Sequence, residues 1–218
     1  AGTMADWVTI SSLATAGGTL VLAVATFSSV KSGNRSARVA ERALLAGVQP
    51  VLIPSREEDH DERLRFGDEQ MLTVPGHGAS IELGDGVIYL AIGLRNGGAG
   101  LAVMQGWHVR PRIDGPLEPP PLEQFRRQQL DLYVPAGESG YWLGAMRDPN
   151  EPGYAEVRTA VQEKRALHVD LMYSDYEGGQ RTIARFMLTR WPGDEVRGER
   201  ASVLRYWNVD RDDPRPAL

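Results

Sequence analysis

The longest apolar run in the chain extends from Trp7 to Val30 and contains 24 residues without a charged side chain. A helix rises about 1.5 Å per residue, so this run would cover about 36 Å, more than a bilayer core of about 30 Å. Its serines and threonines can return hydrogen bonds to carbonyls one turn earlier, so they are compatible with lipid. The pattern predicts a transmembrane helix over residues 7–30, after a short external tail at residues 1–6.

Charge is distributed unequally on the two sides of this run. Before it only Asp6 is charged, whereas residues 31–50 contain four bases and one acid. Basic flanks stay on the cytoplasmic side. We therefore expect a single-pass protein of the cell inner membrane, with its N-terminus outside and its main domain in the cytoplasm. The bases that would set this topology or bind lipid head groups are Lys31, Arg35, Arg38 and Arg42.

The helix is expected to continue past the apolar run. Residues 35–46, RSARVAERALLA, are helix formers without a breaker, and Gly47 followed by Pro50 is a stop signal. We expect a basic juxtamembrane helix over residues 31–49. Small residues in the apolar run repeat every four positions, which allows close helix packing in lipid but also occurs by chance in such compositions. These candidate packing residues are Ser12, Ala14, Ala16, Gly18, Thr19 and Ala23.

From Pro50 onward the pattern predicts short strands joined by turns. The clearest strand, Val87–Asn96, places alternate apolar residues on one face, and the NGGAG turn at residues 96–100 connects it to a second strand at 101–109. A second hairpin is predicted around Gly178–Gly179. Shorter strands are predicted over residues 50–55, 64–66, 130–134, 141–146 and 202–208.

The segments between the predicted strands differ in character. The charge run Glu57–Glu62 indicates a solvated loop, and residues 76–80 are expected to be a loop. Pro111–Pro121 contains five prolines, which favours a rigid crossover outside any sheet. Pro152–Arg165 has the apolar spacing of a helix, with Pro152 at its first position.

Many short strands with one inserted helix indicate a mainly β fold, an antiparallel β-sandwich over residues 50–210 with a flexible tail at 211–218. The tract YLAIGLRNGGAGLAVMQGW, with the later Tyr-Ser-Asp and Gly-Gly-Gln, resembles a group of uncharacterised bacterial proteins. These have one N-terminal transmembrane helix followed by an immunoglobulin-like β-sandwich, and their juxtamembrane helix likewise ends in Gln-Pro. The resemblance implies that fold and a membrane anchor, and it implies no catalytic residues.

Composition excludes several classes of chemistry. The chain has no cysteine, so disulfides, thiolate metal sites and thiol nucleophiles are excluded. Residues 51–218 carry a formal net charge of −7, which argues against non-specific nucleic-acid binding. The GESG sequence at residues 137–140 lacks the second glycine of a nucleophile elbow, and the glycines at 97, 98 and 100 lack the remainder of a phosphate loop.

Two sets of side chains remain as candidates for chemistry or binding. His108, His168 and Asp170 face outward on predicted strands and would form a metal or acid–base set if those strands were neighbours; otherwise they are surface residues. Arg110/Arg112 and Arg126–Arg127 could bind a phosphate or carboxylate, or could pair with the surplus acids.

These observations favour a non-enzymatic interaction module that presents a β-sandwich at the cytoplasmic face of the membrane. The alternative is an accessory subunit of a larger membrane assembly that packs through its single transmembrane helix. A hydrolase built on His108, His168 and Asp170 is the third hypothesis. The expected partners are the membrane and other subunits or a second copy, with no nucleic acid, no small-molecule substrate, no cofactor and no metal.

Overall fold

The chain divides into two compact units, Ala1–Ala46 and Gly47–Leu218. The structure, a computed structural model, describes residues 3–129, 132–191 and 198–211, and for residues 3–17, 20–21 and 42 it describes the backbone alone. Residues 212–218 of the predicted tail (211–218) and the first two residues of the predicted strand 130–134 lie outside this part of the chain.

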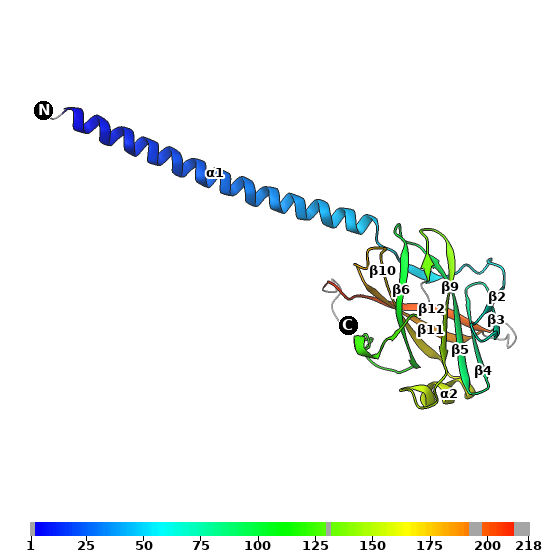
Figure 1. Cartoon of the computed structure of the whole chain (residues 1–218). Coiled ribbons are helices and arrows are strands. Elements are labelled where there is room, and N and C mark those ends of the chain that lie inside the picture. The colour runs from blue at the N-terminus through cyan, green and yellow to red at the C-terminus, as the bar shows by residue number, and fades with distance from the viewer. Residues whose placement is uncertain (1–2, 130–131, 192–197, 212–218) are drawn as a thin grey trace. The chain divides into compact units, whose positions relative to one another are not determined.

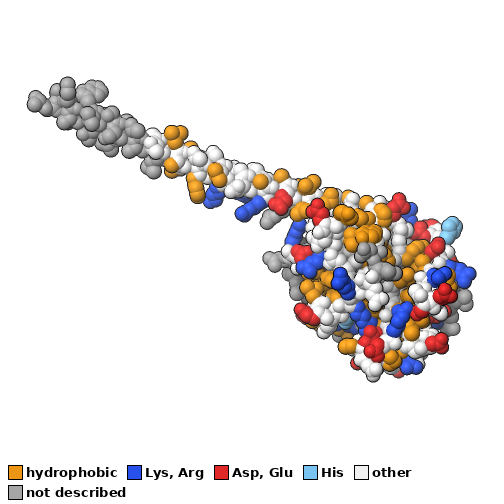
Figure 2. All heavy atoms as spheres, viewed as in Figure 1, with side chains coloured by type: hydrophobic (Ala, Val, Ile, Leu, Met, Phe, Trp, Pro, Cys, Tyr) orange, Lys and Arg blue, Asp and Glu red, His pale blue; other side chains and the backbone are white. Residues whose placement is uncertain are grey.

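The first unit is helix α1 (Thr3–Gly47), a single helix of 45 residues. The predicted continuation beyond residue 30 and the stop at Gly47 are confirmed. Its described apolar side chains lie on the surface (Figure 2). Those in the apolar run are 56–72% exposed: Leu22, Val24, Phe27 and Val30.

Among the residues that the structure describes, no helix combines the length and the apolar character needed to cross a membrane. The transmembrane helix predicted over residues 7–30 is not confirmed.

The second unit is built on a ten-stranded sheet with the order β1-β5-β4-β12-β11-β10-β6-β7, to which β8 is added beside β6 and β9 beside β5. Every described strand pair is antiparallel. The strands of this sheet are β1 (Leu52–Pro54), β4 (Gly78–Gly84), β5 (Val87–Asn96), β6 (Ala102–Pro111), β7 (Arg126–Arg127), β8 (Tyr133–Val134), β9 (Ser139–Met146), β10 (Leu167–Ser174), β11 (Thr182–Arg190) and β12 (Glu199–Asn208). The predicted antiparallel β class is confirmed, whereas the immunoglobulin-like sandwich is not.

The main hydrophobic core lies between β5 and β9 on one side and β6, β10 and β11 on the other (Figure 1). Strand β5 supplies the four residues predicted from alternation, Ile88, Leu90, Ile92 and Leu94, all fully buried. Residues of β10 and β11 at every second position face them: Val169, Leu171, Tyr173, Ala184, Phe186 and Leu188. Alternation along each strand therefore leaves a second set of side chains on the outer faces.

The outer face of β5 and β9 is apolar and is covered by a separate hairpin, β2 (Glu62–Arg65) and β3 (Met71–Val74). Leu72 and Val74 of β3 form a second, smaller core with Tyr89 of β5. The Phe66 ring meets the Tyr89 ring edge-on at 5.0 Å. We call this surface the apolar outer face.

Some predicted boundaries were wrong. Residues 76–80 were expected to be a loop, but β4 begins at Gly78, in a stretch whose glycines and serine give no clear alternation. The inserted helix is present but shorter than predicted: α2 runs from Tyr154 to Gln162, because Gly153 at its N-cap has φ of 82°. A short 3₁₀ helix, η1 (Leu122–Gln124), follows the proline-rich stretch, and we call residues 112–125, which connect β6 to β7, the crossover.

Candidate functional site

Strands β6, β10 and β11 place a polar cluster on the outer face opposite to the core. The antiparallel registers put Asp170 of β10 across from His108 of β6 and from Arg185 of β11. All three side chains point away from the core because their neighbours Val109, Leu171 and others alternate into it. The structure therefore brings together two of the three residues weighed as an acid–base set, and it adds Arg185. We call this surface the polar outer face.

Asp170 and Arg185 form a fully buried ion pair. Arg185 Nε donates to Asp170 Oδ1 at 2.6 Å and Arg185 Nη2 to Asp170 Oδ2 at 3.1 Å. The guanidinium also donates to the carbonyl of Glu118, so the proline-rich crossover lies over this face. On its other side it stacks on the Trp207 ring at 4.9 Å. Outward-facing positions were expected to be solvated, and the crossover is what buries them.

The two histidines of the predicted set have different roles. His108 Nδ1 lies 3.4 Å from Asp170 Oδ2, a long contact that orients the ring. His168 is buried opposite Arg110, and burial, with a smaller effect of Arg185, lowers its pKa to about 4, so it is neutral at physiological pH. Within the described residues no three such side chains are grouped so as to hold a metal ion. Both oxygens of Asp170 are bound to Arg185, which leaves it unsuited to act as a free general base.

The sequence indicated the β10–β11 hairpin but not its register. A turn centred on Gly178–Gly179 would place Met187 opposite Asp170, whereas the observed hairpin is centred one residue earlier and places Arg185 there. The contact to His108 has no signal in the sequence because β6 and β10 are 62 residues apart at this point.

Beside the polar outer face lies a cavity of about 540 Å³. It is lined by β6, by the end of the crossover and by the start of α2, through His108, Val109, Arg110, Pro111, Glu123, Gln124, Phe125, Arg126, Pro152, Gly153 and Glu156. Arg110 and Arg126, which sequence reasoning singled out separately as anion-binding candidates, thus line one cavity. Arg112 does not line it and pairs with Asp114 at 3.2 Å, and Arg127 is exposed.

A second cluster of side chains lies at the start of the second unit, Gly47–Leu218, which we call the β-domain. It holds residues 48–52, which we call the linking segment. The buried Asn96 side chain accepts hydrogen bonds from the backbone N–H of Val51 and Gly98 and donates to the carbonyls of Gly100 and Val134. All four bonding positions of this amide are therefore used. Asn96 ties the linking segment to the NGGAG turn and to β8.

The glycines of this turn serve close approach. A Cβ at Gly98 would overlap the carbonyl oxygen of Gln49, and one at Gly100 would overlap that of Val48. The prediction that these glycines close a hairpin is wrong: β5 pairs with β1, β4 and β9, whereas β6 pairs with β7, β8 and β10, so the turn joins two strands that lie on opposite sides of the core. Neither glycine has a positive φ. They are required because the linking segment lies directly on the turn.

Two tyrosines hold the linking segment from the other side. The N–H of Leu52 donates to the Tyr173 hydroxyl at 3.3 Å, and the Tyr206 hydroxyl donates to the Leu52 carbonyl at 2.8 Å. Burial raises the pKa of Tyr206 to about 12, so both hydroxyls stay protonated. A cavity of about 230 Å³ adjoins them, lined by Gln49, Pro50, Val51, Tyr173, Thr182, Tyr206 and Asn208.

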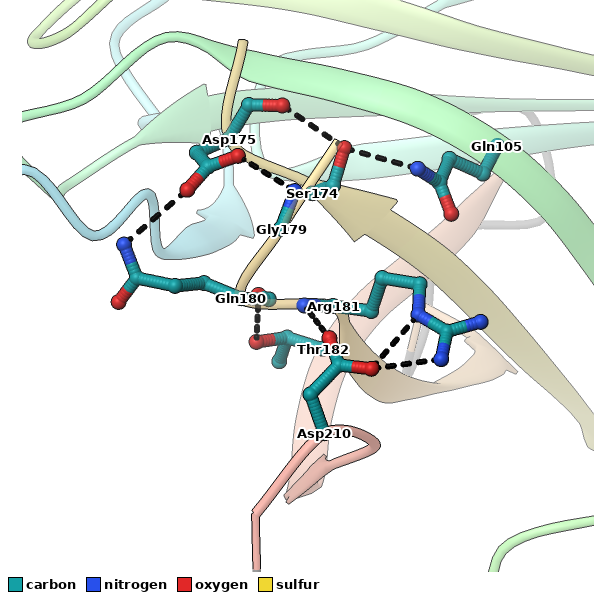
Figure 3. A network of polar contacts seen from close by, with 8 residues as sticks. All are labelled: Gln105, Ser174, Asp175, Gly179, Gln180, Arg181, Thr182 and Asp210. Carbon is teal, nitrogen blue, oxygen red and sulfur yellow. Dashed lines mark hydrogen bonds and ion pairs between the residues drawn. The ribbon is translucent and has the colours of Figure 1, made fainter. Parts of the chain in front are cut away.

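The Tyr-Ser-Asp and Gly-Gly-Gln sequences form a polar network at the same end of the domain (Figure 3). Asp175 accepts from the Gly179 N–H at 2.8 Å and from Gln180 Nε2 at 3.1 Å, which closes the β10–β11 turn. Gln105 Nε2 donates to Ser174 Oγ and so ties β6 to the end of β10. Arg181 and Asp210 form an ion pair at 2.6 Å that joins β11 to the end of β12. The sequences that carried the resemblance thus converge where the chain enters the domain.

The predicted residues of the helix are only partly described. Gly18, Thr19 and Ala23 are exposed, and a Cβ at Gly18 would meet nothing within 4 Å. Lys31, Arg35 and Arg38 are exposed as well. The side chains of Ser12, Ala14, Ala16 and Arg42 lie outside the described part.

Two further features of the sequence can be placed in the structure. Ser139 was interpreted as a turn residue, but it is the first residue of β9, directly after a turn in which Gly137 has φ of 78°. Trp107 and Trp142 belong to the main core and meet edge-on at 5.4 Å.

Comparison with known proteins does not assign a function to these features. No protein family, curated protein or solved structure matches the chain. The resemblance to bacterial proteins with a membrane helix and an immunoglobulin-like domain therefore stays a prediction.

Proposed function

We propose that this protein is a non-enzymatic interaction module, a β-domain of immunoglobulin-like type held at the cytoplasmic face of a membrane by its N-terminal helix. The observation that carries the proposal is the exposed apolar character of α1. Leu22 and Phe27 are 69% and 72% exposed, within a run of 24 residues that has no charge. An isolated helix does not keep such side chains in water, because their burial is what stabilises helices in proteins.

A lipid bilayer is the partner that fits this helix best. The run is long enough to cross a bilayer core, and it has no charged face to direct toward water. The bases Lys31, Arg35 and Arg38, exposed one to two turns beyond the run, suit anionic head groups on one side.

The β-domain supports a role in binding rather than in catalysis. Asp170, the only acid of the predicted acid–base set, is fully buried and has both oxygens bound to Arg185. The linking segment is hydrogen-bonded to the β-domain at Val51 and Leu52, so a force applied to the N-terminal helix would be transmitted to the sheet.

Vesicle flotation tests the anchor. The full chain is reconstituted into neutral phosphatidylcholine vesicles and washed with high salt and with alkaline carbonate. Wild type should float with the vesicles, whereas Leu22→Lys/Val24→Lys should not, since each central lysine opposes insertion by about 3 kcal/mol. The matched control is Val39→Lys/Leu44→Lys, which places the same charges on exposed positions of the same helix outside the run. Release of wild type by the washes, or equal behaviour of the two variants, would contradict the anchor.

Cysteine labelling tests the orientation. The chain has no cysteine, so Tyr176→Cys, at a side chain that is 76% exposed, gives one reactive thiol in the β-domain. In spheroplasts of a bacterial host a membrane-impermeant maleimide should label it only after permeabilisation. Labelling of intact spheroplasts would place the domain outside.

Replacement of residues 7–30 by an unrelated apolar anchor separates the two proposed roles. Interaction through the β-domain predicts that the proteins co-purifying with the detergent-solubilised chain are retained. Their loss would favour the accessory subunit that packs through its helix, with Gly18, Thr19 and Ala23 as the first positions to examine.

A further inference from the structure

We propose that the cavity between β6, the end of the crossover and α2 is a binding site for a small organic anion, a carboxylate or phosphate carried on an apolar body, with Arg110 as its main charged contact. This inference concerns the β-domain and does not depend on the membrane anchor.

Arg110 is the residue that most clearly lacks a counterion. It is half-buried in the cavity wall, and within the described residues it forms no hydrogen bond and no ion pair. Its Nε atom is buried and has no partner there. A buried guanidinium N–H without a partner is costly, and a ligand that bound there would satisfy it.

Arg126 is held rigidly on the adjacent wall. Its guanidinium stacks on the Trp107 ring at 4.7 Å, and its Nη2 donates to the Pro152 carbonyl at 3.2 Å and lies 3.3 Å from Glu151 Oε2. Its Nη1 atom is buried and has no partner in the described chain. One donor of a fixed guanidinium therefore remains for a ligand, and pre-organisation lowers the cost of binding.

The buried and half-buried charges in and behind the cavity wall do not balance. Three guanidiniums, of Arg110, Arg126 and Arg185, accompany two carboxylates, of Asp170 and Glu151. Burial, together with repulsion from Arg185, lowers the pKa of Arg110, and the attraction of Asp170 offsets this only in part. One negative charge would restore the balance.

The other residues that line the cavity indicate the size and the apolar character of the ligand. Glu123 and Glu156 line the cavity but are exposed, so water screens them and they do not neutralise the inner arginines. Phe125, Pro111 and Pro152 supply apolar wall. A volume of about 540 Å³ is that of a small-molecule site, larger than an inorganic ion needs.

Isothermal titration of the full chain in a neutral detergent tests the site. The probes are phenyl phosphate and phenylacetate, with benzyl alcohol as the uncharged control. At least one anion should bind saturably and at least tenfold more tightly than benzyl alcohol, since hydrogen bonds to charged groups are the strongest polar contacts available. If phenyl phosphate binds more tightly, phosphate is the preferred group, and if phenylacetate does, carboxylate is.

Substitutions assign the binding to Arg110. Arg110→Gln should weaken the anion about tenfold or more, and Arg110→Lys should recover part of that loss. Arg112→Gln, a neighbouring arginine outside the cavity, should stay within about twofold of wild type. Absence of saturable binding, equal affinity for benzyl alcohol, or equal effects of Arg110→Gln and Arg112→Gln would overturn the proposal.

A thermal measurement shows whether Arg110 has a structural role instead. Because Arg110 has no partner to lose, the Tm of ligand-free Arg110→Gln should be equal to or above that of wild type, and the bound anion should raise the Tm of wild type alone. A lower Tm for ligand-free Arg110→Gln would assign Arg110 to the fold and contradict the site.

Discussion

The two outer faces of the β-domain are both buried, but by opposite means. The apolar outer face is covered by the β2–β3 hairpin, whose Leu72 and Val74 pack on Tyr89. The polar outer face is covered by the proline-rich crossover, whose Glu118 carbonyl accepts from Arg185 of the buried ion pair. The β2–β3 hairpin is regular and covers apolar side chains, whereas the crossover is irregular and covers charged side chains.

The difference between the faces indicates where stability and where specificity reside. Apolar contacts stabilise without requiring one geometry, whereas a buried ion pair gains little over apolar residues of the same size and is costly to break. We therefore expect the apolar outer face to tolerate changes in proportion to the volume removed. The polar outer face should respond sharply when one charge is left alone.

The largest effect is expected from breaking the ion pair on one side. Arg185→Met leaves Asp170 charged, buried and without its cation, which should lower the free energy of unfolding by about 3–5 kcal/mol. Urea unfolding of the full chain in neutral detergent, followed by tryptophan fluorescence, measures it.

The double variant Asp170→Asn/Arg185→Met is the matched control for that measurement. It removes both charges, so it should recover much of the lost stability. A double variant less stable than Arg185→Met would show that the pair is not the reason for the sensitivity of this face.

A smaller effect is expected on the apolar outer face. Leu72→Ala creates a cavity under the hairpin and should cost about 2–4 kcal/mol. Met71→Ala on the same strand removes a side chain that is 37% exposed and should cost less than half as much. Equal losses for the two variants in the same urea assay would show that the hairpin does not form the predicted cover.

The polar outer face should also respond to pH through His168. Its pKa is lowered to about 4 in the folded protein, against about 6.5 in the unfolded chain. The unfolded state therefore binds more protons between these values, and stability is lost as the pH falls from 6.5 toward 4. His168→Gln should remove about 2 kcal/mol of the pH dependence between pH 7.5 and pH 5.

Glu199 on β12 supplies a control of opposite sign. Burial raises its pKa to about 7, so its contribution is present at low pH and is lost as the pH rises through about 7. Glu199→Gln should make acid destabilisation steeper, whereas His168→Gln should make it shallower. Urea unfolding curves at several pH values decide both, and two changes in the same direction would contradict the assignment.

The core-facing residues of the strands could be predicted from sequence, but the contacts of the polar outer face could not. Alternation in Val87–Asn96 predicted which residues of β5 enter the core, because period-two burial is a local property of a strand. The burial of Asp170 depends on a crossover that carries no periodic pattern. Its contact with His108 depends on the pairing of β6 with β10, and the convergence of Arg110 and Arg126 on one cavity depends on the pairing of β6 with β7 across the crossover. Sequence periodicity reports the element and not the packing of distant elements.

The smallest effect is expected where the apolar outer face meets solvent. Asp68 accepts a hydrogen bond from the Tyr89 hydroxyl at 2.8 Å and pairs with Arg147, also at 2.8 Å. The Tyr89 bond, with a smaller contribution from Arg147, lowers the pKa of Asp68, so its contribution is present above the usual pKa of 3.8 and is lost in acid.

Because Asp68 and Arg147 are solvated, salt should screen their pairing. Asp68→Asn should therefore change the Tm far less than Arg185→Met does, and high salt should reduce that change further. A large, salt-independent loss in Asp68→Asn would mean that charge stabilises the apolar outer face too, and the distinction between the two faces would fail.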